Sequence, residues 1–481
     1  MAEREYTAFF PFGGSGGGAL GFQQATARLF GVDARFRVLG GIDFEPHACA
    51  DFEMLTGVPE LCADVDTLTP KALRERFGTT APDVVFMSPP CKGASGLLSV
   101  AKSKTPKYQA MNELALRWTE LMLRAWPVPP KLVLLENVPR LKQRAGGMLR
   151  KVRSALRAAG YVFQDGFHEC GEIGGLAQVR KRYLLVARHA SRVPPLLYQP
   201  PKKRVRACGE VLGELPLPGD PAAGPMHALP KLSWLNWVRL ALIPAGGDWR
   251  DLEGVLRDGQ PRREVFKRHG VQRWEEPSAT VAGSGSNGPS AVADPRVADV
   301  LRVVRAFDHG YGVLRWDEPS STVAGGSQVG QGAYSVADLR FKCEMRAGAY
   351  GVMSWEAAAA TIRGSFVIGN SPASVADPRK PPRALQVIVA ADGTWHRPIT
   401  PLEKAVLQGL PAVVNGKPLV LSGKSISGWC ERVGNMVPPP TARAIGERML
   451  VCLLQADAEG FALAGSDTPV WVERGEEARL A

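Results

Sequence analysis

Residues 7–31 read TAFFPFGGSGGGALGFQQATARLFG, and this stretch decides the fold. The apolar run 7–11 is typical of a buried strand, although Pro11 inside it predicts a kinked or short one. Glycines follow, and then ALGFQQATARLFG has the composition of a helix. A strand that runs through a glycine-rich turn into a helix is the first unit of an α/β sheet.

The turn itself, FGGSGG from Phe12 to Gly17, has two interpretations. Glycines let a cofactor approach the backbone at a helix N-terminus, where negative charge is favoured. A glycine-rich connection between strand and helix can also serve packing alone. The turn therefore indicates a cofactor site only together with other residues.

Strand-like and helix-like stretches keep alternating to about residue 190. Gly57 closes one helix-like stretch as a C-cap glycine does. Because strands that alternate with helices form parallel sheets, we expect an α/β fold with a doubly wound, mostly parallel sheet. The later stretches are FRVLGGID (36–43), PHACADFEMLTG (46–57), VVFMS (84–88), the helix-like 112–126, KLVLLENV (131–138), the helix-like 148–159 and RYLLVAR (182–188).

Polar side chains follow several of these strands. Asp43 ends the second strand, and Asp64 follows the short run ELCADV. Ligands of open α/β sheets bind at the carboxyl ends of strands, where an acidic group commonly accepts ribose hydroxyls. Together with the glycine turn, these residues predict an adenosine-type cofactor.

Residues 88–96 read SPPCKGASG, which places a cysteine at a strand end on a rigid double-proline turn. Glu136 ends the strand KLVLLE, and QVRKR (178–182) places Arg180 and Arg182 two residues apart on one side of a strand. A thiol beside a carboxyl group and two arginines can act on a ring substrate. A capping carboxyl and a pair of solvated arginines are the alternative interpretations.

Length and charge limit the class of protein. The chain has 481 residues, enough for two domains, and a net charge of +12. That charge favours nucleic acid as a partner, or a basic surface kept for solubility. No apolar run approaches the ~20 residues of a membrane span, and the eight cysteines lack CxxC or zinc spacing. We expect a cytoplasmic protein with reduced thiols and no metal.

An internal repeat occupies the region after the proline-rich, basic stretch PPLLYQPPKKRVR. Trp274, Trp316 and Trp355 lie 42 and 39 residues apart, within HGVQRWEEPSATVAG, YGVLRWDEPSSTVAG and YGVMSWEAAAATIRG. The copies end in SAVADPR, YSVADLR and ASVADPR. Three copies at this period predict one supersecondary unit of short strands and loops, used three times.

These motifs carry a family resemblance. FGGSGG, SPPC, ENV and QVRKR stand in the order and approximate spacing of the DNA cytosine-5 methyltransferase family, as do HRPITPLEKAVLQGLP (396–411) and GNMVPPP (434–440). The resemblance implies a sheet of the S-adenosylmethionine-dependent methyltransferase type with an inserted β-rich target-recognition domain. It divides the chain into catalytic residues 1–190, a recognition region 191–392, a catalytic return 393–455 and a tail 456–481. The repeats lie near 269–296, 311–340 and 350–379.

The resemblance also implies roles for single residues. Cys91 would be the nucleophile on C6 of a flipped cytosine, Glu136 would contact its ring nitrogen and amino group, and Arg182 its carbonyl oxygen. Arg180 and Asn435 would support the site. S-adenosyl-L-methionine would be the cofactor, with Asp43 on the ribose, Phe44 near the adenine and Asp64 on its amino group. The implied cofactor-binding set is Phe12, Gly14, Gly16, Gly17, Asp43, Phe44, Asp64, Val65, Pro89 and Asn435.

DNA contacts are expected in two places. The basic loop after Cys91 carries Lys92, Lys102, Lys104 and Lys107, and could close over phosphates as a lid or remain a solvated loop. The loops of the repeats, with Gln328 among their residues, either read bases or only enlarge a sheet. Lys92 and Ala94 depart from the family, which usually has glutamine and phenylalanine there, so the way the base leaves the duplex is open.

The resemblance also implies binding partners, and other functions have to be weighed against the one that it implies. The resemblance implies double-stranded DNA as partner and a monomer that works with a cognate restriction endonuclease or as an orphan enzyme, in a bacterial or phage-infected cytoplasm near the nucleoid. The rivals are an RNA (tRNA) cytosine-5 methyltransferase, a catalytically silent DNA-binding protein and a dinucleotide oxidoreductase. The large repeat-bearing insert disfavours the first, the intact Cys91, Glu136 and Arg182 disfavour the second, and GNMVP disfavours the third.

Overall fold

The computed structural model describes residues 2–90, 105–195, 199–229 and 395–458, together with short pieces elsewhere. Those pieces are residue 241, two-residue strands between 271 and 389, and the strands β21 (Gly460–Leu463) and β22 (Val470–Glu473). Cys91, Lys92, Lys102, Lys104 and Gln328 lie outside the described residues, as does the side chain of Lys107. Within the described part, none of the helices is both long and apolar enough to cross a bilayer.

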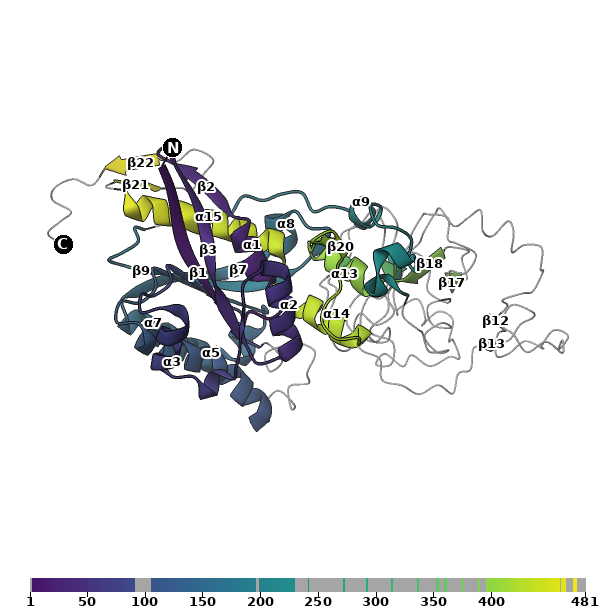
Figure 1. Ribbon diagram of the computed structural model, residues 1–481, viewed down its shortest axis with the longest axis horizontal. Helices are drawn as coiled ribbons and strands as arrows, with labels where there is room; N and C mark the ends of the chain where they lie inside the picture. The colour runs from purple at the N-terminus through teal and green to yellow at the C-terminus, as the bar shows by residue number, and fades with distance from the viewer. Residues whose placement is uncertain are drawn as a thin grey trace, which may run out of the picture.

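One large sheet forms the centre of the catalytic part (Figure 1). Its order is β2-β3-β1-β5-β6-β9-β7, and β4 pairs with β3. The pairs β1–β3, β1–β5, β5–β6 and β3–β4 are parallel, which confirms the mostly parallel sheet. Its strands are β1 (Ala2–Pro11), β2 (Thr26–Leu29), β3 (Val32–Asp43), β4 (Leu61–Cys62), β5 (Val84–Met87), β6 (Leu132–Asn137), β7 (Tyr161–Glu169) and β9 (Lys181–His189).

The sheet differs from the prediction at both edges. Strand β9 runs antiparallel to β6 and β7, and β7 itself was missed by the sequence analysis. The predicted helix over 19–31 is wrong in its second half, because α1 (Gly17–Gln23) stops and β2 pairs antiparallel with β3. Phe30 and Gly31 both have positive φ, 53° and 77°. Two such residues make the tight two-residue hairpin turn that fits twisted strands, so the chain turns back here.

Pro11 lies at the end of the first strand, not within it. Strand β1 is ten residues long, so the prediction of a short strand is wrong. Its pairing with β3 shifts register between Ala8 and Phe9, whereas Pro11 pairs in register with Ile42. The strand therefore delivers the glycine turn at its carboxyl end.

Helices cover both faces of the sheet (Figure 1). On one face, α3 (Pro70–Phe77), α5 (Pro106–Ala125) and α7 (Gly146–Ala158) bury a core that includes Trp118 and Val152. On the other face, α1, α2 (Pro46–Thr56) and α15 (Pro439–Asp457) bury Phe22 and Met449. Burial of large apolar side chains on both faces makes the sheet a rigid platform for its strand ends.

Shorter elements complete the described part. The helices are α6 (Leu141–Arg144), α8 (Cys170–Gly174), α9 (Cys208–Leu212), α13 (Pro401–Leu407) and α14 (Ile426–Asn435), with 3-10 turns at Val65–Thr67, Pro221–Ala223 and Pro225–His227. The strands are β8 (Gln178–Val179), β17 (Ile388–Val389), β18 (Trp395–Pro398), β19 (Val413–Val414) and β20 (Lys417–Pro418).

Two segments that lie far apart in the chain, around His227 and Thr400, meet at a buried cluster. His227 Nδ1 lies 2.9 Å from Thr400 Oγ1, and both side chains are fully buried. Thr400 also caps α13, where Arg397 pairs with Glu403. Residues before and after the intervening region therefore meet at one point, which we term the stem (His227, Arg397, Thr400 and Glu403).

Short strands lie at matching positions of the three repeats. Each copy places the dipeptide after its Tyr-Gly or His-Gly start in parallel register with the dipeptide of its closing segment. The pairs are β10 (Val271–Gln272) with β11 (Ala291–Val292), β12 (Val313–Leu314) with β13 (Ser335–Val336), and β14 (Val352–Met353) with β16 (Ser374–Val375). Strands β10 and β11 also pair with β14, which joins the first and third copies in one sheet.

Candidate active site

An ion pair links the carboxyl end of β6 to the start of β9. Glu136 Oε1 lies 3.1 Å from Arg182 Nε, and the two side chains are 14% and 12% exposed. Both are therefore largely desolvated while keeping an open side. In such surroundings the pair is held in place more firmly than an ion pair in water would be. The structure thus brings together two of the predicted site residues.

A buried hydrogen bond ties this strand end to the turn that carries Cys91. Asn137 Nδ2 donates to the carbonyl of Pro89 at 3.0 Å, and Pro89 is buried. The amide oxygen of Asn137 accepts from the backbone of Val138, so its orientation is set from both ends. Pro89 is two residues before Cys91 along the chain, which fixes where the turn begins relative to Glu136.

Arg180 has different partners from Arg182. Its guanidinium is buried and donates to the carbonyls of Gly434 and Met436 at 3.0 and 3.1 Å. Its backbone N–H donates to Glu169, which also caps α8. Arg180 therefore braces the end of α14 against the active-site strands, while Arg182 faces Glu136.

Sequence reasoning missed His168 and Cys170 beside this pair. His168 is the cross-strand partner of Arg182, on the same face of the sheet, and burial lowers its pKa. Burial also raises the pKa of the Cys170 thiol to about 12, against the opposing charges of Arg182 and Arg180. Both groups are thus neutral near pH 7. Strand β7 was not predicted, so no sequence signal placed them here.

The glycine turn has an unusual backbone. Phe12, Gly14 and Gly16 have positive φ values of 56°, 55° and 83°. A phenylalanine in that region is strained, and such strain collects at ligand sites. A Cβ on Gly14 would have no heavy atom within 4 Å, so the turn is open on that side.

Asp43 holds the turn in this shape. Its carboxylate accepts from the backbone N–H of Gly14 at 3.0 Å, and from Phe44 and Glu45 at 2.8 and 3.1 Å. Burial raises the pKa of Asp43, while these donors oppose the shift. The structure therefore gives Asp43 a bracing role that the sequence analysis did not foresee, beside the ribose contact that stays a prediction.

An aromatic ring and an acid stand next to the turn. Phe44 is 62% exposed although it is a large apolar side chain, and Asp64 is exposed at the start of the 3-10 turn that contains buried Val65. An open ring face and a hydrogen-bond acceptor suit a purine base. Together with the open glycine turn, the residues fit an adenosine-containing cofactor.

The GNMVPPP segment packs directly on the glycine turn. A Cβ on Gly17 would come within 3.0 Å of Met436 and of the Val437 carbonyl, so a glycine is required. Asn435 is exposed at the end of α14, immediately before Met436. Two motifs more than 400 residues apart in the chain thus form one surface.

A buried carboxyl group lies beneath the turn. A Cβ on either Gly13 or Gly41 would collide with Glu60 Oε1, so the carboxyl fills the space between them. Both Glu60 oxygens are buried without a hydrogen-bonded nitrogen or oxygen donor within the described ranges. Burial, followed by the charge of Asp43, raises the pKa of Glu60 to about 9, which the Cys49 thiol partly offsets.

The third repeat reaches the active-site strands. Strand β15 (Ala359–Ala360) pairs in parallel with β8, with Ala359 opposite Gln178 and Ala360 opposite Val179. These alanines stand where the other two copies have the residues after their proline. The altered segment WEAAAATIRG thus contacts the QVRKR segment, next to Arg180.

Known proteins resemble the chain in sequence and in structure. The Type II methyltransferase M1.HphI of Haemophilus parahaemolyticus is 24% identical over 280 residues, which are 56% of this chain and 69% of the relative. The methyltransferase EhMeth of Entamoeba histolytica has 12% identity and a TM-score of 0.47 over 93% of this chain and 97% of its own. A putative DNA modification methyltransferase from an E. coli prophage has 15% identity and a TM-score of 0.43 over 93% and 99%.

The family model gives the assignment. Residues 11–208 match the model of C-5 cytosine-specific DNA methylases. This range contains the glycine turn, the SPPC turn, the Glu136 strand end and QVRKR. Residues 11–208 therefore form a segment that matches the C-5 cytosine-specific DNA methylase domain.

Proposed function

We propose that the protein is a DNA cytosine-5 methyltransferase that uses S-adenosylmethionine and forms a covalent adduct between Cys91 and C6 of a flipped cytosine. The observation that carries this proposal is the half-open Glu136–Arg182 pair, tied through Asn137 and Pro89 to the turn before Cys91. A nucleophile, an acid and an arginine at neighbouring strand ends are what such a reaction needs.

Glu136 and Arg182 hold the cytosine edge in this proposal. Glu136, protonated or sharing a proton, donates at ring N3, while Arg182 donates to the O2 carbonyl. Their mutual contact at 3.1 Å keeps both side chains aimed at the same small ring. Withdrawal of electrons at N3 and O2 makes C6 receptive to a thiolate.

Cys91 supplies the electron pair. Its sulfur bonds to C6, which makes C5 nucleophilic, and C5 is then methylated. Loss of the C5 proton expels the Cys91 thiolate and restores the aromatic ring. When bound, the cofactor supplies a methyl group activated by its sulfonium charge. The residues that would hold it are the glycine turn, Asp43, Phe44 and Asp64, with Val65, Pro89 and Asn435 at the edge.

Duplex DNA is the proposed substrate because of the charge and the insert. A net charge of +12 favours a polyanion, and Lys92, Lys102, Lys104 and Lys107 would contact phosphates. The target base must leave the stack to reach Glu136. Residues 191–392 would be the recognition region, in a monomeric, cytoplasmic enzyme that works with a cognate nuclease or alone.

The third repeat is the proposed anchor, and the first two are the proposed readers. The pairing of β15 with β8 supports an anchoring role for copy three, in which Ala358, directly before β15, replaces the proline of the other copies. Proline lacks the N–H that a strand partner needs. The loops 283–288 and 325–332, which contain Gln328, would then reach bases.

A trapping experiment tests the nucleophile. Cys91→Ser should abolish methyl transfer, because a hydroxyl is a far weaker nucleophile than a thiolate. DNA with 5-fluorocytosine should trap the wild type covalently, since fluorine cannot leave as a proton does. Cys62→Ser is the control, because Cys62 is an exposed thiol on β4, which β3, β1 and β5 separate from the strand that carries Glu136. An active preparation that forms no adduct would contradict the assignment of Cys91.

Methylation mapping tests substrate and recognition. The gene expressed in a methylation-free host should yield 5-methylcytosine at a defined set of duplex sites. Methylated tRNA with unmodified genomic DNA would overturn the choice of DNA. Alanine and serine replacement of loop 283–288 or 325–332 should change the sites, and unchanged sites for both would leave the repeats as scaffold only.

A further inference from the structure

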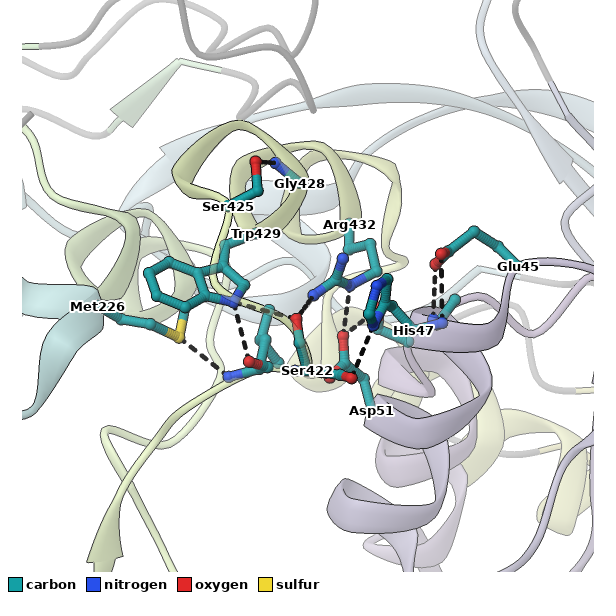
Figure 2. A network of polar contacts seen from close by, with 12 residues as sticks. Glu45, His47, Asp51, Met226, Ser422, Ser425, Gly428, Trp429 and Arg432 are labelled. Atoms are coloured by element: carbon teal, nitrogen blue, oxygen red, sulfur yellow. Dashed lines mark hydrogen bonds and ion pairs between the residues drawn. The ribbon is translucent and has the colours of Figure 1, made fainter.

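Helix α14 carries an arginine that bridges distant parts of the chain. Arg432 Nε lies 2.5 Å from Asp51 Oδ2 on α2. The Asp51 side chain is 1% exposed and that of Arg432 is 11% exposed, so the carboxylate is buried and its arginine partner is largely desolvated. Figure 2 shows the guanidinium between Asp51 and the backbone of Ser422, to which it also donates.

The Asp51 carboxylate is shared between two segments. Its Oδ1 accepts from the backbone N–H of Ser422 at 2.5 Å. Its Oδ2 accepts from Arg432 and also from Ser15 Oγ at 3.3 Å. Ser15 is the central residue of the glycine turn and is buried. The Asp51 carboxylate therefore contacts both the glycine turn, through Ser15, and the segment 421–436, through Ser422 and Arg432.

The segment 421–436 extends the contacts of Asp51 toward Met226, next to the stem. Trp429 Nε1 on α14 donates to the carbonyls of Leu421 and Ser422 at 2.8 and 3.1 Å. The backbone N–H of Leu421 lies 3.2 Å from the sulfur of Met226, which is fully buried (Figure 2). Met226 adjoins His227 of the stem. The polar network thus runs from the cofactor turn to the stem.

The other end of α14 is equally constrained. The last carbonyls of a helix have no partners within it, and here side chains donate to them. Arg180 donates to the carbonyls of Gly434 and Met436, and Gln408 donates to that of Val433. Met436 packs on Gly17 of the glycine turn. Because both ends are held, α14 moves as one body with whatever displaces the turn.

The energy of the buried Asp51 carboxylate depends closely on the positions of its hydrogen-bond donors. Burial raises the pKa of Asp51, and the Ser422 amide and Arg432 oppose that shift. A buried carboxylate that loses its donors is strongly destabilised, so small movements of the turn carry a large energetic penalty. Energetic coupling between sites travels through such packed, hydrogen-bonded elements.

We propose that Arg432 and Asp51 are positioning residues that transmit occupancy of the cofactor turn, through Ser15, to the segment 421–436 and the stem. Binding of the cofactor then steadies the base of the recognition region before DNA arrives. The inference rests on the proposed function, because it takes the glycine turn as the cofactor site. By linkage, a steadied recognition region must in turn favour the cofactor.

Hydrogen exchange with S-adenosylhomocysteine as the probe tests this without DNA or turnover. In the wild type, saturating probe should slow amide exchange in the turn 12–17 and also in 421–436, the latter about fivefold or more, the lower end of typical couplings. Ser15→Ala should keep the protection of the turn and reduce that of 421–436 to less than about twofold. Asp51→Asn should do the same, and Ser15→Ala covers the case in which Asp51→Asn fails to fold.

Two controls separate the outcomes. Arg443→Gln breaks a comparable but exposed pair with Glu447 on α15, and should retain the remote protection. Protection confined to the turn in the wild type, or remote protection that survives in Ser15→Ala and Asp51→Asn, would overturn the inference alone. A wild type that binds no S-adenosylhomocysteine would overturn the proposed function and the inference with it.

Discussion

Two carboxylate–guanidinium pairs in this molecule have the same chemical groups but differ in their exposure to solvent and in their number of contacts. In the stem, Arg397 meets Glu403 with two contacts of 3.0 and 2.7 Å, and the side chains are 2% and 0% exposed. At the active site, Arg182 meets Glu136 through one contact of 3.1 Å, and both keep more than a tenth of their surface exposed. The first pair is closed and the second is open on one side.

The difference separates a pair that stabilises the fold from the pair that we propose to be catalytic. Glu403 also accepts from the backbone of Thr400 at 2.9 Å, so its acceptor capacity is largely used. Burial alone would raise the pKa of Glu403, but the charge of Arg397 brings it below its ordinary value. Glu136 keeps acceptor positions for a ligand. A closed pair stabilises the fold, while an open one is available to a substrate.

The largest expected effect is on turnover at the open pair. Glu136→Gln keeps the shape but removes the proton donor, and should lower turnover by roughly two to four orders of magnitude. The melting temperature and the affinity for S-adenosylhomocysteine should stay close to wild type. Single-turnover kinetics and calorimetry measure these quantities, and a variant with normal turnover but weak cofactor binding would remove Glu136 from the reaction.

The closed pair should respond in the opposite way. Glu403→Gln leaves the Arg397 charge buried without its partner, which typically costs about 3–5 kcal/mol of unfolding free energy. Turnover per folded molecule should be nearly unchanged. Urea unfolding and active-site titration measure the two quantities. A variant of normal stability would show that the stem tolerates an unpaired arginine, and the proposed distinction would then fail.

Glu60 sharpens the comparison, because it is a buried carboxyl group without an arginine. Its folded-state pKa of about 9 lies above the ordinary 4.5, so the folded state keeps a proton that the unfolded chain loses. Stability should therefore fall as pH rises between about 4.5 and 9. Glutamine does not titrate, so Glu60→Gln should remove this pH dependence, and its effect on stability should be more favourable at pH 8 than at pH 4.5 by roughly 2–5 kcal/mol. Thermal unfolding at both pH values measures this, and an equal effect at the two would contradict it.

The smallest effect is expected at an exposed pair. Arg443 and Glu447 lie one turn apart on α15 at 2.8 Å, with side chains 50% and 35% exposed. Arg443→Gln should change the unfolding free energy by no more than about 0.5 kcal/mol, the usual worth of such a pair. Addition of salt should reduce even that. A loss of several kcal/mol would mean that exposure does not rank these pairs.

The sequence predicted the fold correctly where a local pattern is compatible with a single type of secondary structure. Alternating strand and helix stretches, and the C-cap at Gly57, gave the sheet and α2. The helix predicted through residue 31 failed, because ATARLFG has no residue that marks a turn except Gly31. The hairpin depends on Phe30 adopting positive φ and on the pairing partner β3, which no local pattern reports.

The site was predicted through its motifs and missed where contacts are long-range. Glu136 and Arg182 stand together as the motifs implied. The division of labour between Arg180 and Arg182 depends on α14, which is more than 250 residues away in the chain. His168 and Glu60 gave no signal, because their roles come from neighbours on other strands and not from a motif. The placement of Cys91 and the lysine loop stays a prediction.

The stem has a consequence for how this protein can change over generations. Because the segments that flank the proposed repeat-bearing region meet at the His227–Thr400 contact of 2.9 Å, a change in the length of that region need not move either flank. Closing a loop of twice the length costs only about 0.6 kcal/mol more, so duplication or loss of a repeat is nearly neutral for folding. Under the proposed function, gain or loss of a repeat would therefore alter the proposed recognition region while the glycine turn and the Glu136–Arg182 pair stay in place.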